Sequence, residues 1–289
     1  MQITNEAKIP DVIVRDIKAD PYSRGESDIS VTELIAPPRI ISLRRKHKDQ
    51  ISVEAIDLVW SLYGRVMHNI LEQAGESVQD IITEERLFTE QTGWTVSGSF
   101  DALAMSSKGK DAYAITDYKF VTAWRFVDGM PEEMIQQLNL YAELLRRHGY
   151  EVRELFLVAL YRDWSKNRAK GNSSYPQKAV EVHEVPLWDQ KRATAFMEKR
   201  IGMHKQAQES LPKCTRKERW TNPPQPQWAL MKDGRKSAIK LYNDADEAER
   251  AKTSNDNYVV FRAGTDVRCE NYCDVAQFCS QYQNTKEKN

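Results

Sequence analysis

The sequence predicts a mixed α/β fold in which a β-sheet is flanked by helices. Three segments with the apolar patterning of strands follow a helical segment, and a second helix and a further strand come directly after them. The order helix, three strands, helix, strand is typical of an α/β sandwich. The chain has 289 residues, of which 40% are hydrophobic and 29% are charged. Such a chain can bury one sizeable core with a smaller lobe appended.

The elements of the first half have clear boundaries. Residues 1–50 are polar and interrupted by proline, with one short helix that ends at Pro37 and Pro38. Residues 56–71 place apolar side chains at helical spacing. The next strand-like segments are residues 80–90, 94–105 and 112–121. Turn-forming residues in the stretch SSKGKD join the last two segments, which we expect to form a hairpin.

The second half begins with a helix between Pro131 and Gly149, the usual asymmetry of helix ends. Two strands and a long helix are then expected over residues 152–164, 180–187 and 188–210. Beyond Leu211 the chain becomes rich in Pro, Trp and basic residues. We therefore expect an N-terminal extension over residues 1–50, a core domain over residues 51–211 and a C-terminal lobe over residues 212–289.

Composition limits the setting and the partners. Lys and Arg together number 42, as do Asp and Glu, so a nucleic-acid-binding function would need local basic clusters. The candidates are residues 39–48, 162–170 and 213–219, although such runs are more often solvated faces. The sequence has no apolar run long enough for a membrane span and no secretory pattern at its N-terminus. We expect a cytoplasmic protein, in which structural disulfides are rare.

Two aspartates interrupt the predicted hairpin strands. A turn centred near Lys108 or Gly109 places Asp101 opposite Thr116 or Asp117. In the second register the two carboxylates share a face, with Cβ atoms roughly 5 Å apart, and Lys119 emerges on the same face. Opposed like charges need a positive group between them, and a hard divalent cation is the simplest one. The alternative is a salt bridge between Lys119 and an exposed aspartate.

Two pairs of residues on the predicted helices add further polar groups. His68 and Glu72 are four residues apart, as are Gln137 and Tyr141, so each pair shares one helix face. Taken singly, a helical His is usually a surface residue and a helical Tyr usually belongs to the core. Their order relative to the two aspartates is more specific than either pair alone.

Four short motifs occur in a fixed order: GRVMHNILE on a helix, GSFD on a strand, DYK on a strand and QLNLY on a helix. This combination resembles the PD-(D/E)XK nuclease superfamily, in particular its RecB-like branch, which includes CRISPR adaptation nucleases and phage-type exonucleases. The resemblance covers about residues 55–162. It implies a restriction-endonuclease-like mixed sheet flanked by helices, with a C-terminal cysteine-bound lobe.

The resemblance also implies roles for the matching residues. His68, Asp101, Asp117 and the backbone carbonyl of Tyr118 would be metal ligands. Asp101, Asp117, Lys119, Gln137 and Tyr141 would form the catalytic set. Glu72 has no firm counterpart; it is a candidate for contacting the metal ligands without binding the metal itself. The chain has Ser-Phe-Asp where many members have Pro-Asp, which is common in the RecB-like branch.

The implied chemistry is metal-dependent hydrolysis of DNA. Mg²⁺ or Mn²⁺ held by the acids and His68 would polarise the phosphate and acidify a bound water. Lys119 would orient that water or stabilise the developing negative charge. Gln137 and Tyr141 would hold the lysine or a phosphate. The resemblance thus implies an exonuclease acting on linear ends or single strands in DNA recombination, repair or phage DNA processing.

The four cysteines are confined to the C-terminal part of the chain. Cys269, Cys273 and Cys279 form a close triplet and Cys214 stands alone upstream. This grouping resembles the iron–sulfur staple of RecB-like nucleases and implies a [4Fe–4S] cluster; a Zn²⁺ site and unliganded thiols are the alternatives. In the family the lone cysteine usually precedes the nuclease core and the triplet opens C-x₂-C, and the chain departs from both patterns.

Two other classes of function stay open at this point. A nuclease-like fold can bind DNA without cutting it, and an iron–sulfur protein can transfer electrons. The second class leaves His68 and the strand carboxylates unexplained. In the lobe, Trp228 and Tyr242 are either core residues or platforms on which the bases of single-stranded DNA stack. Digestion polarity, strand preference and oligomeric state are not encoded in these motifs.

Overall fold

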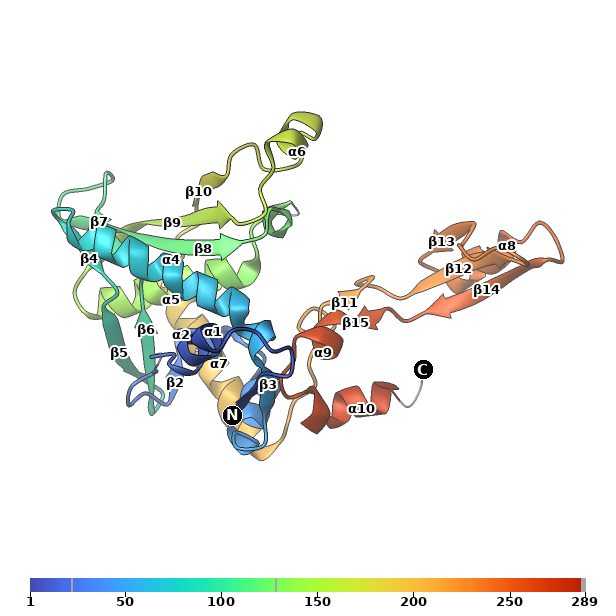
Figure 1. Ribbon diagram of the computed structural model, residues 1–289, viewed down its shortest axis with the longest axis horizontal. Coiled ribbons are helices and arrows are strands. Elements are labelled where there is room, and N and C mark those ends of the chain that lie inside the picture. Colours follow the sequence, from blue (N-terminus) through green and yellow to red (C-terminus); the bar gives the residue numbers. More distant parts are fainter. Residues whose placement is uncertain (22, 128, 287–289) are drawn as a thin grey trace. The chain divides into compact units, whose positions relative to one another are not determined.

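The computed structural model describes residues 1–21, 23–127 and 129–286. The chain forms two compact units. Unit 1 consists of Met1–Pro38 and Ser52–Glu209, and unit 2 consists of Arg39–Ile51 and Ser210–Asn289. Figure 1 shows their helices and strands in the colours of the sequence. Within the described ranges, no helix has both the length and the apolar character needed to cross a membrane.

The main sheet of unit 1 has five strands in the order β10-β9-β8-β7-β4. Its strands are β4 (Ile81–Thr83), β7 (Ala102–Met105), β8 (Ala112–Val121), β9 (Glu151–Tyr161) and β10 (Val180–Glu184). The central strands β8 and β9 are parallel, and the other neighbours are antiparallel. The prediction of a mixed α/β fold is therefore confirmed.

A second sheet of unit 1 has three strands in the order β2-β6-β5. Its strands are β2 (Ile29–Ser30), β5 (Arg86–Gln91) and β6 (Trp94–Ser99). A further parallel pair joins β1 (Gln2–Thr4) to β3 (Ser52–Glu54). The prediction of single strands over residues 80–90 and 94–105 is wrong, because each segment breaks in the middle and passes from one sheet to the other.

The two breaks lie next to each other and are held together by hydrogen bonds between distant segments. Glu84, between β4 and β5, has a φ of 49°, which no extended strand allows. Asp101, between β6 and β7, turns its carboxylate onto the backbone N–H of Tyr118. The backbone N–H of Glu84 in turn donates to the carbonyl of Asp101. Two acidic residues therefore meet at the point where the chain changes sheets.

Helices cover the sheets of unit 1. They are α1 (Asp11–Lys18), α2 (Val31–Ile35), η1 (Ala55–Leu58), α4 (Val59–Glu76), η2 (Ala123–Phe126), α5 (Glu132–Arg147), α6 (Lys166–Gly171) and α7 (Gln190–Glu209). Helix α5 packs against strands of both sheets and is the centre of the core, since most of its residues are buried. Helix α4 packs on β4 and β8 and has no fully buried residue.

Unit 2 combines short helices with two small sheets. Its elements are α3 (Pro38–Lys46), β11 (Thr221–Asn222), β12 (Gln227–Lys232), β13 (Lys240–Tyr242), α8 (Ala245–Arg250), β14 (Asn257–Arg262), β15 (Thr265–Asp266), α9 (Val267–Asn271), η3 (Ala276–Phe278) and α10 (Ser280–Lys286). Strands β13, β12 and β14 form one sheet, and β11 pairs with β15. The basic stretch of residues 39–48 thus belongs to the same unit as all four cysteines.

Candidate functional site

The hairpin of β7 and β8 fixes the position of the two aspartates. The observed partners, such as Ala102 with Thr116 and Leu103 with Ile115, have the register that places Asp101 in line with Asp117. The second of the two predicted registers is therefore confirmed. Asp101 lies one residue before β7, and Asp117 lies in the middle of β8 with only 1% of its surface exposed.

Three donors from three different elements converge beside this hairpin. The Nδ1 atom of His68, on α4, lies 3.6 Å from Oε1 of Glu84 and 3.6 Å from Oδ1 of Asp101. One ligand atom from each residue lies within 4.8 Å of the other two, an arrangement that can hold a metal ion. Imidazole nitrogen and carboxylate oxygen suit a divalent cation such as Mg²⁺ or Mn²⁺.

Glu84 was not among the metal ligands predicted from the sequence. It belongs to an ordinary acidic stretch, TEE, and no spacing rule connects it to His68 or Asp101. Its position depends on the positive φ that ends β4 and on the hydrogen bond to Asp101, and both are tertiary features. A non-glycine residue held at positive φ is a conformation found often at functional sites.

The electrostatics of the three donors favour a bound cation. Burial and the nearby charge of Asp117 raise the pKa of Asp101 to about 7, although Lys119, His68 and the N–H of Tyr118 oppose this. The interaction with Glu84 raises the pKa of His68, and burial partly offsets it. Negative charge thus accumulates at the site, and protons neutralise it when no metal does.

Asp117 and Lys119 form an ion pair next to the three donors. The Nζ atom of Lys119 lies 2.6 Å from Oδ2 of Asp117. Burial lowers the pKa of Lys119, but the carboxylates of Asp117 and Asp101 outweigh this and the pKa is raised. Neither carboxylate oxygen of Asp117 has a hydrogen bond of good geometry within the described residues. A buried carboxylate of this kind still has acceptor capacity to offer.

The predicted ligand set is only partly assembled. His68 and Asp101 come together with Glu84, whereas among the described residues no group of three within the same limit contains Asp117. A direct bond from Asp117 to a metal stays a prediction, as does the ligand role of the Tyr118 carbonyl. The N–H of Tyr118 donates to Oδ2 of Asp101 over 2.7 Å and holds that carboxylate in place.

The remaining predicted residues are Gln137, Tyr141 and Glu72. Nε2 of Gln137 donates to the hydroxyl of Tyr141 over 2.7 Å, so the two residues form one unit on α5. Tyr141 is buried against Gly98 of β6, where a Cβ atom would come within 2.9 Å of the ring. Burial and the charges of Glu84 and Glu76 raise the pKa of Glu72, which therefore lies within electrostatic reach of the site.

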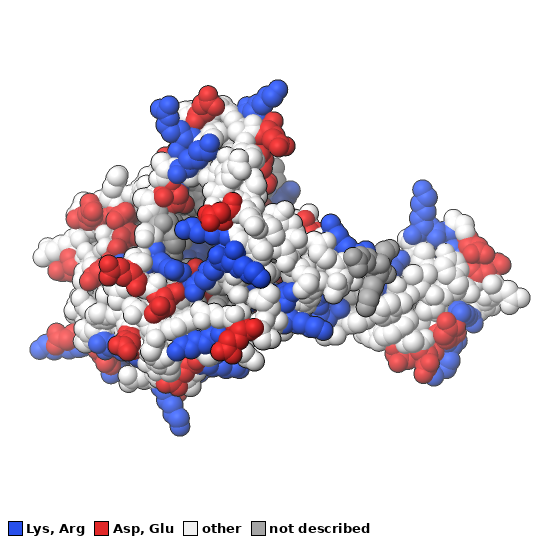
Figure 2. Space-filling model, turned by 90° about the horizontal axis from the view of Figure 1, so that it is seen from below, with Lys and Arg blue, Asp and Glu red and all other residues white. Residues whose placement is uncertain are grey.

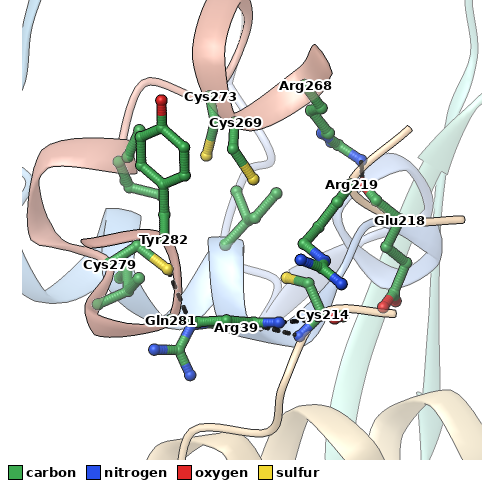
Figure 3. A pocket seen from close by; sticks show the side chains of 14 residues that line it. Arg39, Cys214, Glu218, Arg219, Arg268, Cys269, Cys273, Cys279, Gln281 and Tyr282 are labelled. Carbon is green, nitrogen blue, oxygen red and sulfur yellow. Dashed lines mark hydrogen bonds between the residues drawn. The ribbon is translucent and has the colours of Figure 1, made fainter. Parts of the chain in front are cut away.

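The four cysteines line one pocket of unit 2 (Figure 3). No three of their sulfur atoms lie within 4.8 Å of one another in the described chain. A tetrahedral zinc site would need sulfur–sulfur separations of about 3.8 Å, from zinc–sulfur bonds of about 2.3 Å. The sulfur atoms of the described chain are therefore not placed as the ligands of a single zinc ion.

Arg39 is the charged partner of this pocket. It is 5% exposed, its Nε donates to Sγ of Cys279 over 3.1 Å and its Nη2 donates to Oγ of Ser280 over 2.9 Å. Its Nη1 donates to the carbonyls of Leu211 and Pro212. Among the described residues Arg39 has no carboxylate partner. A buried cation without a counter-charge is costly, so the pocket fits an anionic occupant.

The thiols of Cys214, Cys269 and Cys273 are protonated when no metal is present. Burial, aided by neighbouring charges, raises the pKa of Cys214 to about 12 and that of Cys269 to about 11. Burial also raises the pKa of Cys273. Thiolates are therefore stable here only when a metal or cluster compensates their charge. Donor chemistry and the buried arginine both agree with a cysteine-ligated cluster.

The basic residues beside Cys214 serve mainly to hold unit 2 together. Arg216 donates to the carbonyls of Pro223, Pro224 and Ala263. Arg219 pairs with Asp266. These guanidinium groups are committed to internal contacts, which argues against the expectation that the 213–219 run as a whole faces DNA.

These observations define a mixed α/β protein with one candidate divalent-cation site and one thiol pocket. No family model matches the chain, and no curated protein matches it. Among solved structures, that of SSO0001 is similar with 19% identity and a TM-score of 0.46, over 67% of this chain and 85% of that chain. A "Putative exonuclease" from Eubacterium rectale is 11% identical with a TM-score of 0.30, over 59% of this chain and 62% of that chain. Both likenesses are too distant to carry an argument about function, which has to come from the side chains.

Proposed function

We propose that the chain is a metal-dependent deoxyribonuclease that hydrolyses phosphodiester bonds, as an exonuclease acting on linear ends or single strands. The observation that carries the proposal is the convergence of His68, Glu84 and Asp101, with the Asp117–Lys119 ion pair beside them. Three metal donors and one fixed amine are the groups that phosphodiester hydrolysis requires.

His68, Glu84 and Asp101 would hold Mg²⁺ or Mn²⁺. A divalent cation bound there supplies positive charge for the phosphate and lowers the pKa of a bound water. The backbone N–H of Tyr118 orients one oxygen of Asp101 and leaves the other, Oδ1, facing His68. The donors are therefore preorganised by the break between β6 and β7.

Lys119 would supply the second positive charge. Its raised pKa keeps the ammonium group charged in a buried position, where its attraction for a phosphoryl oxygen is strong. Asp117 holds the ammonium group in place through the 2.6 Å contact. Lys119 would then stabilise the negative charge that develops on the phosphate during attack by water.

We also propose that Cys214, Cys269, Cys273 and Cys279 hold a [4Fe–4S] cluster with a structural role. The pattern of one lone cysteine and a close triplet, without the paired C-x₂-C knuckles of zinc sites, and the buried guanidinium of Arg39 support this over zinc. The cluster would fasten the segment around Cys214 to the C-terminal helices, closing a loop whose ordering is otherwise costly. Iron and zinc analysis of anaerobically purified protein, together with its visible spectrum, tests the assignment.

A cleavage assay tests the nuclease proposal. Labelled linear duplex, circular duplex and single-stranded DNA are incubated with Mg²⁺, Mn²⁺ or EDTA. We expect loss of linear or single-stranded substrate only with the metals. Retention of all substrates with a gel shift would instead support a binding module that does not cut, and neither cleavage nor a shift would leave an electron-transfer role for the cysteine pocket.

A further inference from the structure

Charge is divided unequally between the two units. Unit 1 contains 23 Lys and Arg against 30 Asp and Glu, whereas unit 2 contains 19 against 12. The balanced total of the whole chain therefore conceals an acidic unit and a basic one. A basic unit attracts polyanions, and the excess in unit 2 indicates that it has a partner of that kind.

Within unit 2 the charges are segregated further. Four of its acids, Asp244, Asp246, Glu247 and Glu249, lie in α8 or directly before it. The strands β12, β13 and β14 and the β12–β13 loop contain one acid, Asp233. The same elements contain five exposed cations: Lys232, Arg235, Lys236, Lys240 and Arg262. The three-stranded sheet is thus the basic part of a basic unit.

A row of three aromatic rings crosses this sheet. Trp228 on the central strand lies opposite Tyr242 on one neighbour and Phe261 on the other, so the three side chains share one face. The ring centroids of Trp228 and Phe261 are 5.4 Å apart. Nζ of Lys240 lies 5.0 Å from the centre of the Tyr242 ring. Phe261 is 56% exposed, so the end of the row on β14 is accessible to solvent.

A second exposed pair of rings lies near the cysteine pocket. Trp220 is 43% exposed and Tyr272 is 67% exposed, and their centroids are 5.5 Å apart. The guanidinium of Arg268 lies 5.0 Å from the centre of the Trp220 ring. Trp220 also has a φ of 53°, an outlier for so bulky a residue. Residues are held in such conformations mostly where function requires them.

One short helix packs against this sheet. Among the described elements, the short helix α8 is the one that packs against all three strands. A six-residue helix cannot cover both faces of a sheet. In Figure 2 the part of the surface formed by β12–β14 and α8 (right of the view) is largely uncharged at its centre, with charged side chains at its margins.

We propose that unit 2 binds single-stranded DNA, with bases stacked on the Trp228–Tyr242–Phe261 row and on the Trp220–Tyr272 pair. The exposed cations of the β12–β13 hairpin contact the phosphates. Rings that are free to stack on bases, combined with basic side chains, are the pattern of single-strand binding, because the bases of a duplex are already stacked on each other. The choice of DNA as the polyanion rests on the proposed nuclease function.

Fluorescence anisotropy with dye-labelled oligothymidine and the full-length protein in EDTA tests the proposal. We expect Phe261→Ala and Tyr272→Ala each to weaken binding by roughly fivefold or more, the effect of losing one stacked base. The matched control is Tyr258→Ala, which removes a 40% exposed ring from the opposite face of β14 and leaves the affinity unchanged. We expect Lys240→Gln to reduce the salt dependence by about one phosphate contact.

Several results would overturn the assignment. One is wild-type protein that does not bind oligothymidine; another is a pair of folded ring variants that bind as well as wild type. Tighter binding of oligouridine or of duplex DNA would assign the surface to another nucleic acid. A dimer that Phe261→Ala dissociates, with DNA binding unchanged, would assign the row to self-association. Melting curves establish that each variant is folded, and Lys240→Gln changes an exposed side chain.

The test is separate from that of the nuclease proposal because it contains no divalent cation. Wild-type protein that binds oligothymidine through these rings but never cuts contradicts the nuclease proposal alone. Protein that cuts DNA while every ring variant binds as wild type contradicts the surface proposal alone.

Discussion

The two candidate metal sites differ in almost every physical respect. The site in unit 1 offers one imidazole and two carboxylates on partly exposed side chains, at a place where the chain passes between two sheets. The pocket in unit 2 offers four thiols beside a buried arginine. Hard cations such as Mg²⁺ prefer oxygen ligands, whereas zinc and iron–sulfur clusters prefer thiolates.

The difference shows how one chain can keep two metals apart. Each site offers donors that suit one class of metal, and each lies in its own compact unit. The site in unit 1 suits an ion that exchanges with solvent and contacts substrate, because His68 and Glu84 are partly exposed. The pocket in unit 2 suits a permanent group, because its thiols are stable as anions only when they are ligated.

The largest expected effect is a loss of DNA cleavage in unit 1 without a loss of folded structure. We expect Asp117→Ala to reduce cleavage by about a hundredfold or more, since Lys119 loses the carboxylate that positions it. The circular dichroism spectrum should stay that of wild type, and iron content should not change. Asp111→Asn, an exposed change just before the same strand, is the control. A soluble, folded Asp117→Ala protein that still cuts DNA would contradict the assignment.

The next effect concerns unit 2 alone. We expect Cys269→Ser to remove the bound iron and the visible absorbance and to lower the melting temperature of unit 2. The affinity of unit 1 for Mn²⁺ should stay within about twofold of wild type, because sites without shared partners behave independently. Glu84→Gln is the reciprocal control, which should keep the iron. A colourless wild-type protein with stoichiometric zinc would show that the cluster assignment is wrong.

The third effect concerns the donor that the sequence did not reveal. We expect Glu84→Gln to weaken Mn²⁺ binding by about tenfold or more, as measured by calorimetry, because a carboxylate ligand becomes a neutral amide. Glu85→Gln removes the same charge from the next residue, which is exposed, and should bind as wild type. Equal Mn²⁺ affinities for the two variants would show that Glu84 is not a metal ligand.

Metal binding in unit 1 should also depend on pH. The pKa of Asp101 is raised to about 7 and that of His68 is raised, so both groups take up protons as the pH falls. We expect the dissociation constant for Mn²⁺ to rise by up to about a hundredfold per pH unit below pH 7, because a metal must displace one proton from each of the two groups. A pH-independent affinity, or the same slope in Asp101→Asn, would contradict this.

The same groups set the stability of the metal-free protein. A carboxyl with a raised pKa destabilises the fold as the pH rises from the ordinary range of aspartate through 7, whereas His68 stabilises it until its own raised pKa is passed. We therefore expect Mn²⁺ to raise the melting temperature more at pH 8 than at pH 6. Thermal melts with and without the metal measure this difference.

The smallest effect concerns Arg39. We expect Arg39→Lys to destabilise unit 2 by about 1–2 kcal/mol, because lysine keeps the charge but cannot reproduce the contacts to Cys279 and Ser280. Arg44→Lys, which changes an exposed arginine paired with Asp274, is the matched control and should be nearly neutral. Chemical denaturation of both variants gives the comparison. Equal stabilities would show that Arg39 contributes only its charge.

Local rules in the sequence predicted the hairpin that carries the aspartates. The turn chemistry of residues 107–110 limited the register of β7 and β8 to two alternatives, and the observed one places Asp101 in line with Asp117. The long helices α4, α5 and α7 were predictable for a similar reason, since apolar spacing and end residues are local signals. The expectation of one short helix in residues 1–50 was wrong, because α1 precedes it and α3 begins at Pro38, where proline fits the first turn of a helix. These features needed no knowledge of distant contacts.

The rest of the site depends on tertiary structure. Glu84 reaches His68 only because two strands break at adjacent points, and strand patterning does not show where a run of apolar residues changes sheets. Arg39 reaches Cys279 across 240 positions of sequence. The spacing of the cysteines indicated a metal site. The cation beside that site, Arg39, belongs to residues 39–48, which the sequence identified only as a basic stretch.

The pairing of β11 with β15 has a practical consequence for engineering. These two short strands bring Thr221 opposite Asp266, so the chain enters and leaves the excursion between Cys214 and Cys269 through a narrow neck. Residues 225–262 can therefore be exchanged as a cassette for a short glycine–serine bridge. A trimmed protein that retains its iron but binds oligothymidine more weakly would show that the cluster does not depend on the three-stranded sheet.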